Sequence, residues 1–176
     1  MQINQVKTAR KVGDFVKKKS GPNLIDIKYV LPNSELIDDI PRIYLMTSNG
    51  IIKKIGGSAS KGGIKATMSF YTNSQQGSPG VARFVLHHPI AEEIDAGNNV
   101  ELFMITSPKV KAPVNGLFGA YEIAVASFKE MEDLCKKDYF EIEGKYPEWN
   151  FQENSMTYPS RLAKLHNDYH NNRLTN

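Results

Sequence analysis

The segment from Arg42 to Ser58 constrains the fold more than any other part of the chain. Two stretches rich in Ile, Tyr, Leu and Met, residues 42–48 and 51–55, are separated by Asn49-Gly50. An Asn-Gly pair between two such stretches is a strong signal for a β-hairpin, because both residues accept the positive φ values that a tight turn requires. The sequence therefore predicts two adjacent antiparallel strands here.

The register of this hairpin decides which side chain lies beside Tyr44. A two-residue Asn-Gly loop places Tyr44 opposite Ile55, whereas a three-residue loop that includes Ser48 places it opposite Lys54. We predict the three-residue loop, because only that register puts the phenol and the ammonium together. A cation beside a phenol lowers its pKa from about 10 and helps it to take a proton from an attacking water. In the alternative interpretation, Tyr44 is a packed aromatic and Lys54 a solvated strand residue.

Length and composition limit the class of protein. The 176 residues fit one domain, and a hydrophobic content of 40% is enough for a core. The mean hydropathy of -0.41 and the lack of a long apolar run argue against a membrane span. The basic N-terminal segment has no apolar stretch behind it, so we expect no secretory signal and a cytoplasmic protein. Cys135 is the only cysteine, which excludes an internal disulfide and a cysteine-based zinc site.

Basic residues are concentrated near the N-terminus, although the net charge is only +3. The only acid there is Asp14, and the bases are Lys7, Arg10, Lys11, Lys17, Lys18 and Lys19. A basic arm of this kind favours contacts with DNA phosphates, which we expect from Lys17, Lys18 and Lys19. An ordinary solvated helix is the alternative interpretation of the same residues.

Turn signals divide the rest of the chain into further elements. Strands are expected over residues 24–31 and 100–107, and loops over residues 72–80 and 108–119. Helices are expected over residues 2–19, 64–72, 81–96 (with a kink or break at Pro89), 120–139 and 159–173.

The predicted helix over residues 120–139 carries an acid at the edge of its apolar stripe. At about 100° per residue, the stripe consists of Tyr121, Ala124, Phe128, Met131 and Cys135. Glu132 lies about 40° from Phe128 around the helix axis. A carboxylate on the buried side of a helix is costly unless it is paired or binds a metal. Glu132 is therefore a candidate metal ligand, and an ordinary acid at a helix flank is the alternative.

These features together resemble the GIY-YIG endonuclease family, and the small restriction-type and phage-type members most of all. Arg42-Ile43-Tyr44 and Lys54-Ile55-Gly56 match the two motifs that open the family's sequence, and Pro147-Glu148-Trp149-Asn150 is similar to its late motif. The match covers residues 42–150, and the order of the motifs carries it more than any single one.

The resemblance implies a DNA endonuclease that hydrolyses phosphodiester bonds in double-stranded DNA, most simply a site-specific enzyme of restriction type. In such an enzyme Tyr44, tuned by Lys54, activates a water. Glu132 holds one Mg²⁺ or Mn²⁺, and Asn150 orients the site. Cleavage of both strands requires two active sites or two visits, so a homodimer is one option.

One feature of the family is missing from this chain. The family places an arginine on the helix after the second motif, where it binds the scissile phosphate. Thr67 occupies that position here, and either Lys65 or Arg83 is the expected substitute. Lys61 and His87 are further candidates for contact with DNA.

We therefore expect an α+β fold with a three-stranded, mostly antiparallel sheet of residues 42–48, 51–56 and 100–106, flanked by helices. The expected organisation is a single domain with a basic N-terminal arm (1–40), a nuclease core (41–152) and a C-terminal helical extension (153–176). The alternatives are a nicking endonuclease of a phage or mobile element, a DNA-binding protein that has lost the reaction, and an unrelated α+β interaction module. The missing arginine motivates the second of these.

Overall fold

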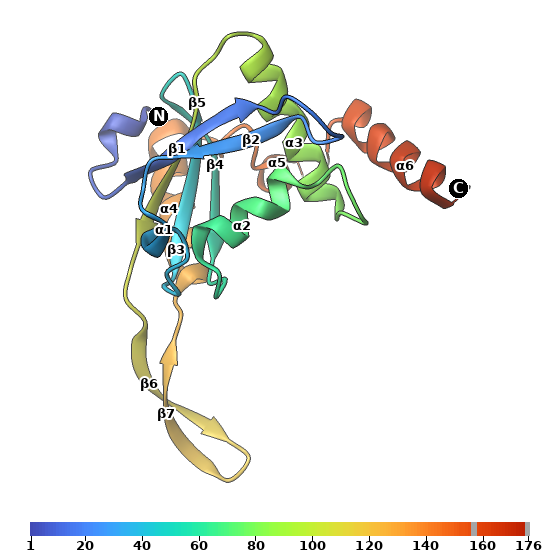
Figure 1. The fold of residues 1–176 in the computed structure, drawn as a ribbon. Helices are drawn as coiled ribbons and strands as arrows, with labels where there is room; N and C mark the ends of the chain where they lie inside the picture. The colour runs from blue at the N-terminus through green and yellow to red at the C-terminus, as the bar shows by residue number, and fades with distance from the viewer. Residues whose placement is uncertain (156–157, 175–176) are drawn as a thin grey trace.

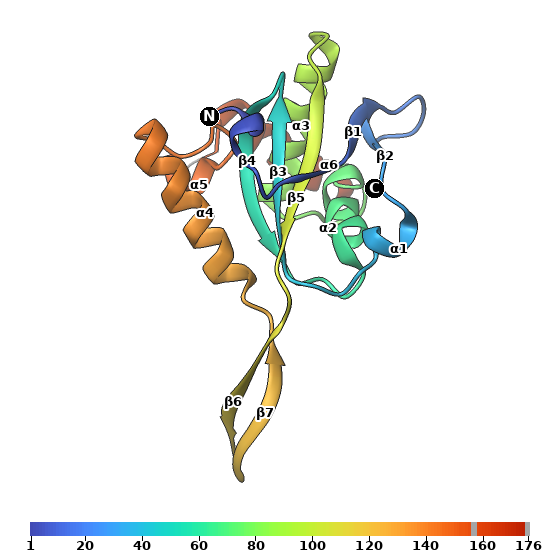
Figure 2. The ribbon, with the colours of Figure 1, turned by 90° about the vertical axis from the view of Figure 1, so that its left-hand side faces the viewer.

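The computed structural model describes residues 1–155 and 158–174 (Figure 1). Its centre is a five-stranded antiparallel sheet with the strand order β2-β1-β5-β3-β4. A second sheet, β6-β7, projects away from the body of the molecule (Figures 1 and 2). The strands are β1 Arg10–Lys17, β2 Ile25–Tyr29, β3 Arg42–Ser48, β4 Ile51–Ser58, β5 Val100–Thr106, β6 Val110–Gly116 and β7 Gly119–Val125. The helices are η1 Ile3–Gln5, α1 Asn33–Leu36, α2 Gly63–Thr72, α3 Val81–Asp95, α4 Phe128–Glu143, α5 Phe151–Ser155 and α6 Ser160–Leu174.

Different helices cover the two faces of the large sheet. α2 and α3 pack on the face that presents Tyr44 and Met46, and Leu86 of α3 is buried there. α4 packs on the opposite face, where its Tyr139 joins Leu45 in a second apolar cluster. Because successive residues of a strand point to opposite faces, β3 contributes to both clusters and is buried along its whole length.

The three strands expected at the centre of the sheet form where the sequence predicts them, as β3, β4 and β5. The sheet has five strands rather than three, because β1 and β2 extend it beyond β5. The expected strand over residues 24–31 is β2, and the expected helices over 64–72, 81–96 and 159–173 are α2, α3 and α6. No helix in the described part of the chain has the length and apolar character that crossing a bilayer requires.

The turn between β3 and β4 contains two residues, not three, so the predicted loop is wrong. Ser48 pairs with Ile51 across the turn. Asn49 and Gly50 have φ values of 47° and 77°, the pattern of a type I′ turn. This turn matches the right-handed twist of its strands, and Asn-Gly is the pair that adopts it most readily.

A bulge at Lys53 then changes the register further along the hairpin. Because Lys53 is an extra residue on β4, the partner of Tyr44 becomes Gly56 rather than Ile55 or Lys54. Lys54 lies opposite Met46, on the same face as Tyr44 but two pairs further along the hairpin.

The basic N-terminal segment is not a helix. After the short η1 helix, strand β1 begins at Arg10. This strand pairs with β2 on one side and with β5 on the other. Val12 and Phe15 of β1 are buried in the core, on the face covered by α3. The pairing with two neighbouring strands decides the conformation here, a tertiary constraint that local helix preference does not contain.

The expected loop over residues 108–119 and the first part of the helix over 120–139 are instead the β6-β7 hairpin. Tyr121, Ile123 and Val125 recur with a period of two, and part of this pattern also fits a helical stripe. α4 begins only at Phe128. Of the predicted apolar stripe, Phe128, Met131 and Cys135 therefore lie on a helix, whereas Tyr121 and Ala124 lie on β7.

His87 is a core residue, which corrects the expectation that it contacts DNA. The ring is fully buried, and its Nε2 accepts a hydrogen bond from the backbone N–H of Leu24 at 2.9 Å. Its Nδ1 lies 2.8 Å from the carbonyl oxygen of Tyr71, to which it donates. Burial lowers the pKa of His87, so the ring is neutral and joins α3 to the β1–β2 turn and to the end of α2.

This buried histidine predicts a loss of stability in acid. The unfolded chain takes up a proton on His87 near pH 6.5, whereas the folded chain does so only at lower pH. The unfolded state therefore binds more protons below about pH 6.5, and the free energy of unfolding falls as the pH drops from about 7 to about 5. Urea titrations across this range should give a shallower pH dependence for His87→Gln than for the original protein. Equal slopes for the two proteins would contradict the prediction.

The contact between Gly56 and Tyr44 predicts a steric effect on stability. A Cβ at position 56 would lie 2.3 Å from both Cζ and Oη of Tyr44. Because the ring is buried, we expect Gly56→Ala to lower the free energy of unfolding by about 3 kcal/mol, as overpacking does. Gly80→Ala is the matched control, since a Cβ there meets nothing within 4 Å, and should cost less than about 1 kcal/mol. Similar losses in the two variants, measured by urea unfolding, would argue against the close contact.

Candidate active site

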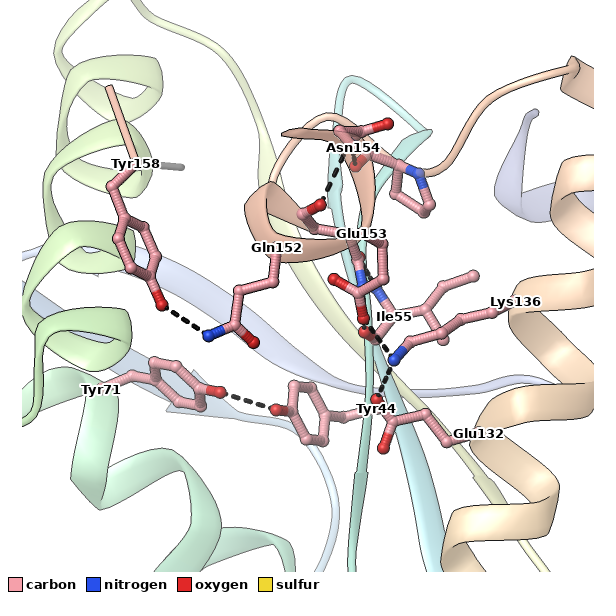
Figure 3. A network of polar contacts seen from close by, with 11 residues as sticks. Tyr44, Ile55, Tyr71, Glu132, Lys136, Gln152, Glu153, Asn154 and Tyr158 are labelled. Atoms are coloured by element: carbon pink, nitrogen blue, oxygen red, sulfur yellow. Dashed lines mark hydrogen bonds and ion pairs between the residues drawn. The ribbon is translucent and has the colours of Figure 1, made fainter. Parts of the chain in front are cut away.

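Polar side chains from several elements meet at the outer edge of β4 (Figure 3). Tyr44 and Tyr71 approach from the face covered by α2 and α3, while Glu132 and Lys136 come from α4 and Glu153 comes from α5. β4 is the last strand of the sheet, so side chains from both faces reach the same edge. This edge is the candidate active site.

Tyr44 and Tyr71 form a hydrogen-bonded pair. Their hydroxyl oxygens are 2.6 Å apart, and their ring centroids are 6.0 Å apart at an interplanar angle of 62°. Burial raises the pKa of Tyr44 well above its usual value, and the neighbouring Tyr71 raises it further. The positive charge of Arg83 acts in the opposite direction and does not outweigh burial. Tyr44 is therefore a neutral phenol, which corrects the expectation of a lowered pKa.

Lys54 does not tune Tyr44 across the hairpin as the sequence suggested, because it lies opposite Met46. It lines a cleft together with Tyr71, Trp149 and Glu153. Burial lowers the pKa of Lys54, and the negative charge of Glu153 only partly offsets this effect. The cleft therefore contains an amine that is shifted toward its neutral form.

Glu132 reaches the edge of β4 beside Gly57. A Cβ at position 57 would lie 2.6 Å from Oε2 of Glu132, so the glycine leaves the space that the carboxylate occupies. Oε1 of Glu132 forms an ion pair of 2.6 Å with Nζ of Lys136, one helical turn further along α4. Lys136 also pairs with Glu153 and lies between the two carboxylates (Figure 3).

The carboxylates at this edge fit a hard divalent cation. Mg²⁺ usually binds one or two protein carboxylates and keeps several waters. Glu132 and Glu153 already share one positive charge, the ammonium of Lys136, so their oxygens converge on a single cation. Within residues 1–155 and 158–174 no cluster of three or more His, Cys, Asp or Glu side chains is arranged to hold a metal. Glu132 and the nearby Glu153 are the carboxylates at this edge that could bind such an ion.

Asn150 positions β4 rather than facing the cleft. The side chain is fully buried, and its Oδ1 accepts a hydrogen bond of 2.9 Å from the N–H of Ile55. Its Nδ2 donates to the carbonyl oxygen of Ile55 at 3.0 Å. The N–H of Trp149 donates to the carbonyl oxygen of Lys53 at 2.7 Å. The segment before α5 is therefore hydrogen-bonded along β4, next to Lys54.

Thr67, at the family's arginine position, and Lys65, one expected substitute, each have a hydrogen-bond partner outside the tyrosine pair. Thr67 is buried, with its hydroxyl 2.7 Å from that of Ser58, and it links α2 to the end of β4. Lys65 precedes Tyr71 by six residues, which places it about 240° around the axis of α2. Its ammonium donates to Asn33 of α1 at 3.0 Å. Lys65 is therefore directed toward α1 rather than toward the tyrosine pair.

Arg83 lies over Phe70 of α2, and its charge acts on the tyrosine pair. Its guanidinium is 4.0 Å from the ring centroid of Phe70, a cation–π contact that holds it near the end of α2. Burial raises the pKa of both Tyr44 and Tyr71, and the charge of Arg83 opposes the rise in each. Of the two expected substitutes, the geometry favours Arg83.

The lysines expected to contact DNA lie in two different places. Lys17, Lys18 and Lys19 lie at the end of β1 and in the turn that follows, on the far side of the sheet from β4. Lys17 forms an ion pair of 2.5 Å with Asp95. Lys61 lies in the exposed turn that follows β4. The three N-terminal lysines are therefore separated from the candidate active site by the other strands of the sheet.

Lys136 and Glu153 were not predicted as parts of the site. Lys136 follows Glu132 by four residues, a spacing typical of an ion pair on one face of a helix, and this signal could have identified it. Glu153 has no comparable local signal, because α5 reaches the edge of β4 only through the hydrogen bonds made by the residues before it.

Comparisons with known proteins place this fold among endonucleases. No protein-family model and no curated protein matches the chain. The structure of a mutant of bacteriophage T4 EndoII matches 85% of this chain and 99% of its own, with 15% identity and a TM-score of 0.55. The restriction endonuclease HPY188I, in complex with product DNA, matches with 84% of each chain covered, 13% identity and a TM-score of 0.50. The chain therefore shares its fold with a phage endonuclease and a restriction endonuclease.

Proposed function

We propose that the chain is a metal-dependent DNA endonuclease of GIY-YIG type, most simply a site-specific enzyme of restriction type. The observation that carries the proposal is the approach of Tyr44 and Glu132 to the edge of β4 (Figure 3), together with the positive charge of Arg83, which acts on Tyr44 and Tyr71 from the side of α2. A hydroxyl, a guanidinium and a carboxylate are the groups that hydrolysis of a phosphodiester requires. The shared fold supports the proposal, since both matched proteins are endonucleases.

In the proposed reaction a water attacks the phosphorus and the 3′ oxygen leaves. Arg83 binds the non-bridging oxygens of the phosphate through its planar guanidinium. Tyr44 donates a hydrogen bond to Tyr71 and accepts one from the attacking water, which it thereby orients. Lys54 lines the cleft beside Tyr71 and, in its neutral form, accepts the proton that the water loses, while the leaving 3′ oxygen takes up a proton from solvent. Glu132 would hold Mg²⁺ or Mn²⁺, which would supply Lewis-acid stabilisation of the charge that develops on the phosphate.

The first test removes the carboxylate and the phenol. Glu132→Gln and Tyr44→Phe should each lower the rate of plasmid cleavage by at least about 10²-fold, because each removes a group that acts in the transition state. Glu130→Gln is the control, since Glu130 is an exposed acid on the same helix, and it should leave the rate unchanged. Digestion of supercoiled plasmid and of phage DNA, with and without Mg²⁺ or Mn²⁺, measures the effect. Normal cleavage by Glu132→Gln and Tyr44→Phe would show that these residues are not catalytic.

The second test separates the two candidate cations. Arg83→Ala should lower the cleavage rate by about 10²- to 10³-fold, whereas Lys65→Ala should change it little. Arg83→Lys should restore only part of the rate, because an ammonium lacks the planar fork that binds two phosphate oxygens. The opposite ranking of Arg83→Ala and Lys65→Ala would restore Lys65 as the phosphate ligand.

A DNA-binding protein without the reaction is the second candidate, and Thr67 at the usual arginine position is the observation that favours it. Such a protein would bind duplex DNA with an affinity that falls steeply with salt. It would cleave no DNA with either metal ion, and Glu132→Gln would not affect its affinity. The plasmid assay described above therefore separates the two candidates.

A further inference from the structure

Among residues 1–155 and 158–174, no other element packs against most of the β6-β7 hairpin. β6 and β7 pair only with each other, and Figures 1 and 2 show them extending away from the rest of the molecule. An isolated two-stranded hairpin is marginally stable in water. Residues 110–125 therefore need a surface that covers them, and their own sequence indicates what kind.

The register of the hairpin collects apolar side chains on one face. The cross-strand pairs on this face are Val110–Val125, Ala112–Ile123 and Val114–Tyr121. The opposite face has the pairs Lys111–Ala124, Pro113–Glu122 and Asn115–Ala120. Because cross-strand pairs alternate between the two faces, the hairpin is amphipathic along its whole length.

The apolar face and the tip of the hairpin are exposed. Val110 and Tyr121 have more than half of their surface in contact with solvent, at 56% and 54%. At the tip, Leu117 is 95% and Phe118 is 91% exposed. A continuous apolar surface of this kind is unusual on a monomer and marks an interaction site.

The charges of the hairpin favour a protein over DNA as its partner. Its cations are Lys109 and Lys111, and each already has an acidic partner. Lys109 pairs with Asp39 at 2.8 Å, and Lys111 pairs with Glu122 at 3.5 Å. Binding to phosphates depends on cations that neutralise them, and the apolar face carries none.

We propose that the β6-β7 hairpin is a dimerisation arm, which packs its apolar face against the same face of a second copy of this chain. A flat face of aliphatic and aromatic pairs is complementary to itself, as a two-fold interface requires. Its seven large exposed side chains, each presenting on the order of 100 Å², offer about 700 Å² per copy, close to the roughly 800 Å² per partner of a standard interface. They are Val110, Val114, Leu117, Phe118, Tyr121, Ile123 and Val125.

The arm also connects directly to the candidate active site. Only Ala126 and Ser127 separate β7 from α4, the helix that carries Glu132. Pairing two arms therefore sets the distance between two copies of the edge of β4. Provided that the chain is the proposed nuclease, this arrangement gives a dimer with one active site for each strand of a duplex.

The test compares variants of the two faces by their mass in solution. Tyr121→Ser/Ile123→Thr places polar residues on the apolar face and keeps residue types that strands accept. Ala120→Ser/Ala124→Thr introduces the same two residue types on the opposite face. Sedimentation equilibrium should give a dimer for the original protein and the second variant, and a monomer for the first. Circular dichroism and urea unfolding check that the body of each variant is folded.

Two results would overturn the proposal, whatever the outcome of the cleavage assays. The first is a monomeric original protein at all concentrations, and the second is a dimer that survives in Tyr121→Ser/Ile123→Thr. Loss of duplex affinity in that variant without a change of mass would instead identify the arm as a DNA contact.

A cleavage readout tests the link to the active site. If the dimer cuts both strands at once, the original protein should convert supercoiled plasmid directly to the linear form. The monomeric variant should keep cutting and accumulate nicked circles first. A protein that dimerises through the arm but cuts no DNA would leave the dimer established and remove only the proposed nuclease function.

Discussion

Two adjacent glycines on an edge strand make the candidate active site possible. Gly56 and Gly57 follow one another in β4, so they face opposite sides of the sheet. The missing side chain of Gly56 leaves room for the ring of Tyr44, and that of Gly57 leaves room for the carboxylate of Glu132. A phenol from one core and an acid from the other therefore approach a common edge, which residues with a Cβ would keep apart.

Burial sets the electrostatics of this edge and opposes charge on its tyrosines and on Lys54. It raises the pKa of Tyr44 and Tyr71 and lowers the pKa of Lys54. The charges that remain are paired, as in the bridge of Lys136 between Glu132 and Glu153. A substrate phosphate and a divalent cation would bring charges of both signs into this environment, where the low dielectric makes each interaction stronger than in water. In the resting state the two tyrosine hydroxyls therefore stay protonated, and the charged form of Lys54 is disfavoured by burial.

The sequence predicted the elements better than the relations between them. Asn49-Gly50 located the hairpin, because the turn depends on two local residues. The register failed, because the bulge at Lys53 carries no local signal and moves the partner of Tyr44 to Gly56. Most of β7 was predicted as a helix because a short apolar run fits both periods, and β6 was predicted as part of a loop. In the site, Tyr44 and Glu132 were found through motifs, whereas Glu153 depends on tertiary packing that no local pattern encodes.

The bonds made by Asn150 have a consequence for solubility as well as for geometry. An edge strand exposes unpaired N–H and C=O groups, and another chain can add to them and begin an aggregate. The amide of Asn150 occupies both backbone groups of Ile55, and Trp149 occupies the carbonyl of Lys53. The outer edge of β4 is thereby closed to strand addition where the candidate active site lies. A side-chain amide thus does for this sheet what an additional strand would do, and it leaves the space in front of the edge open to a substrate.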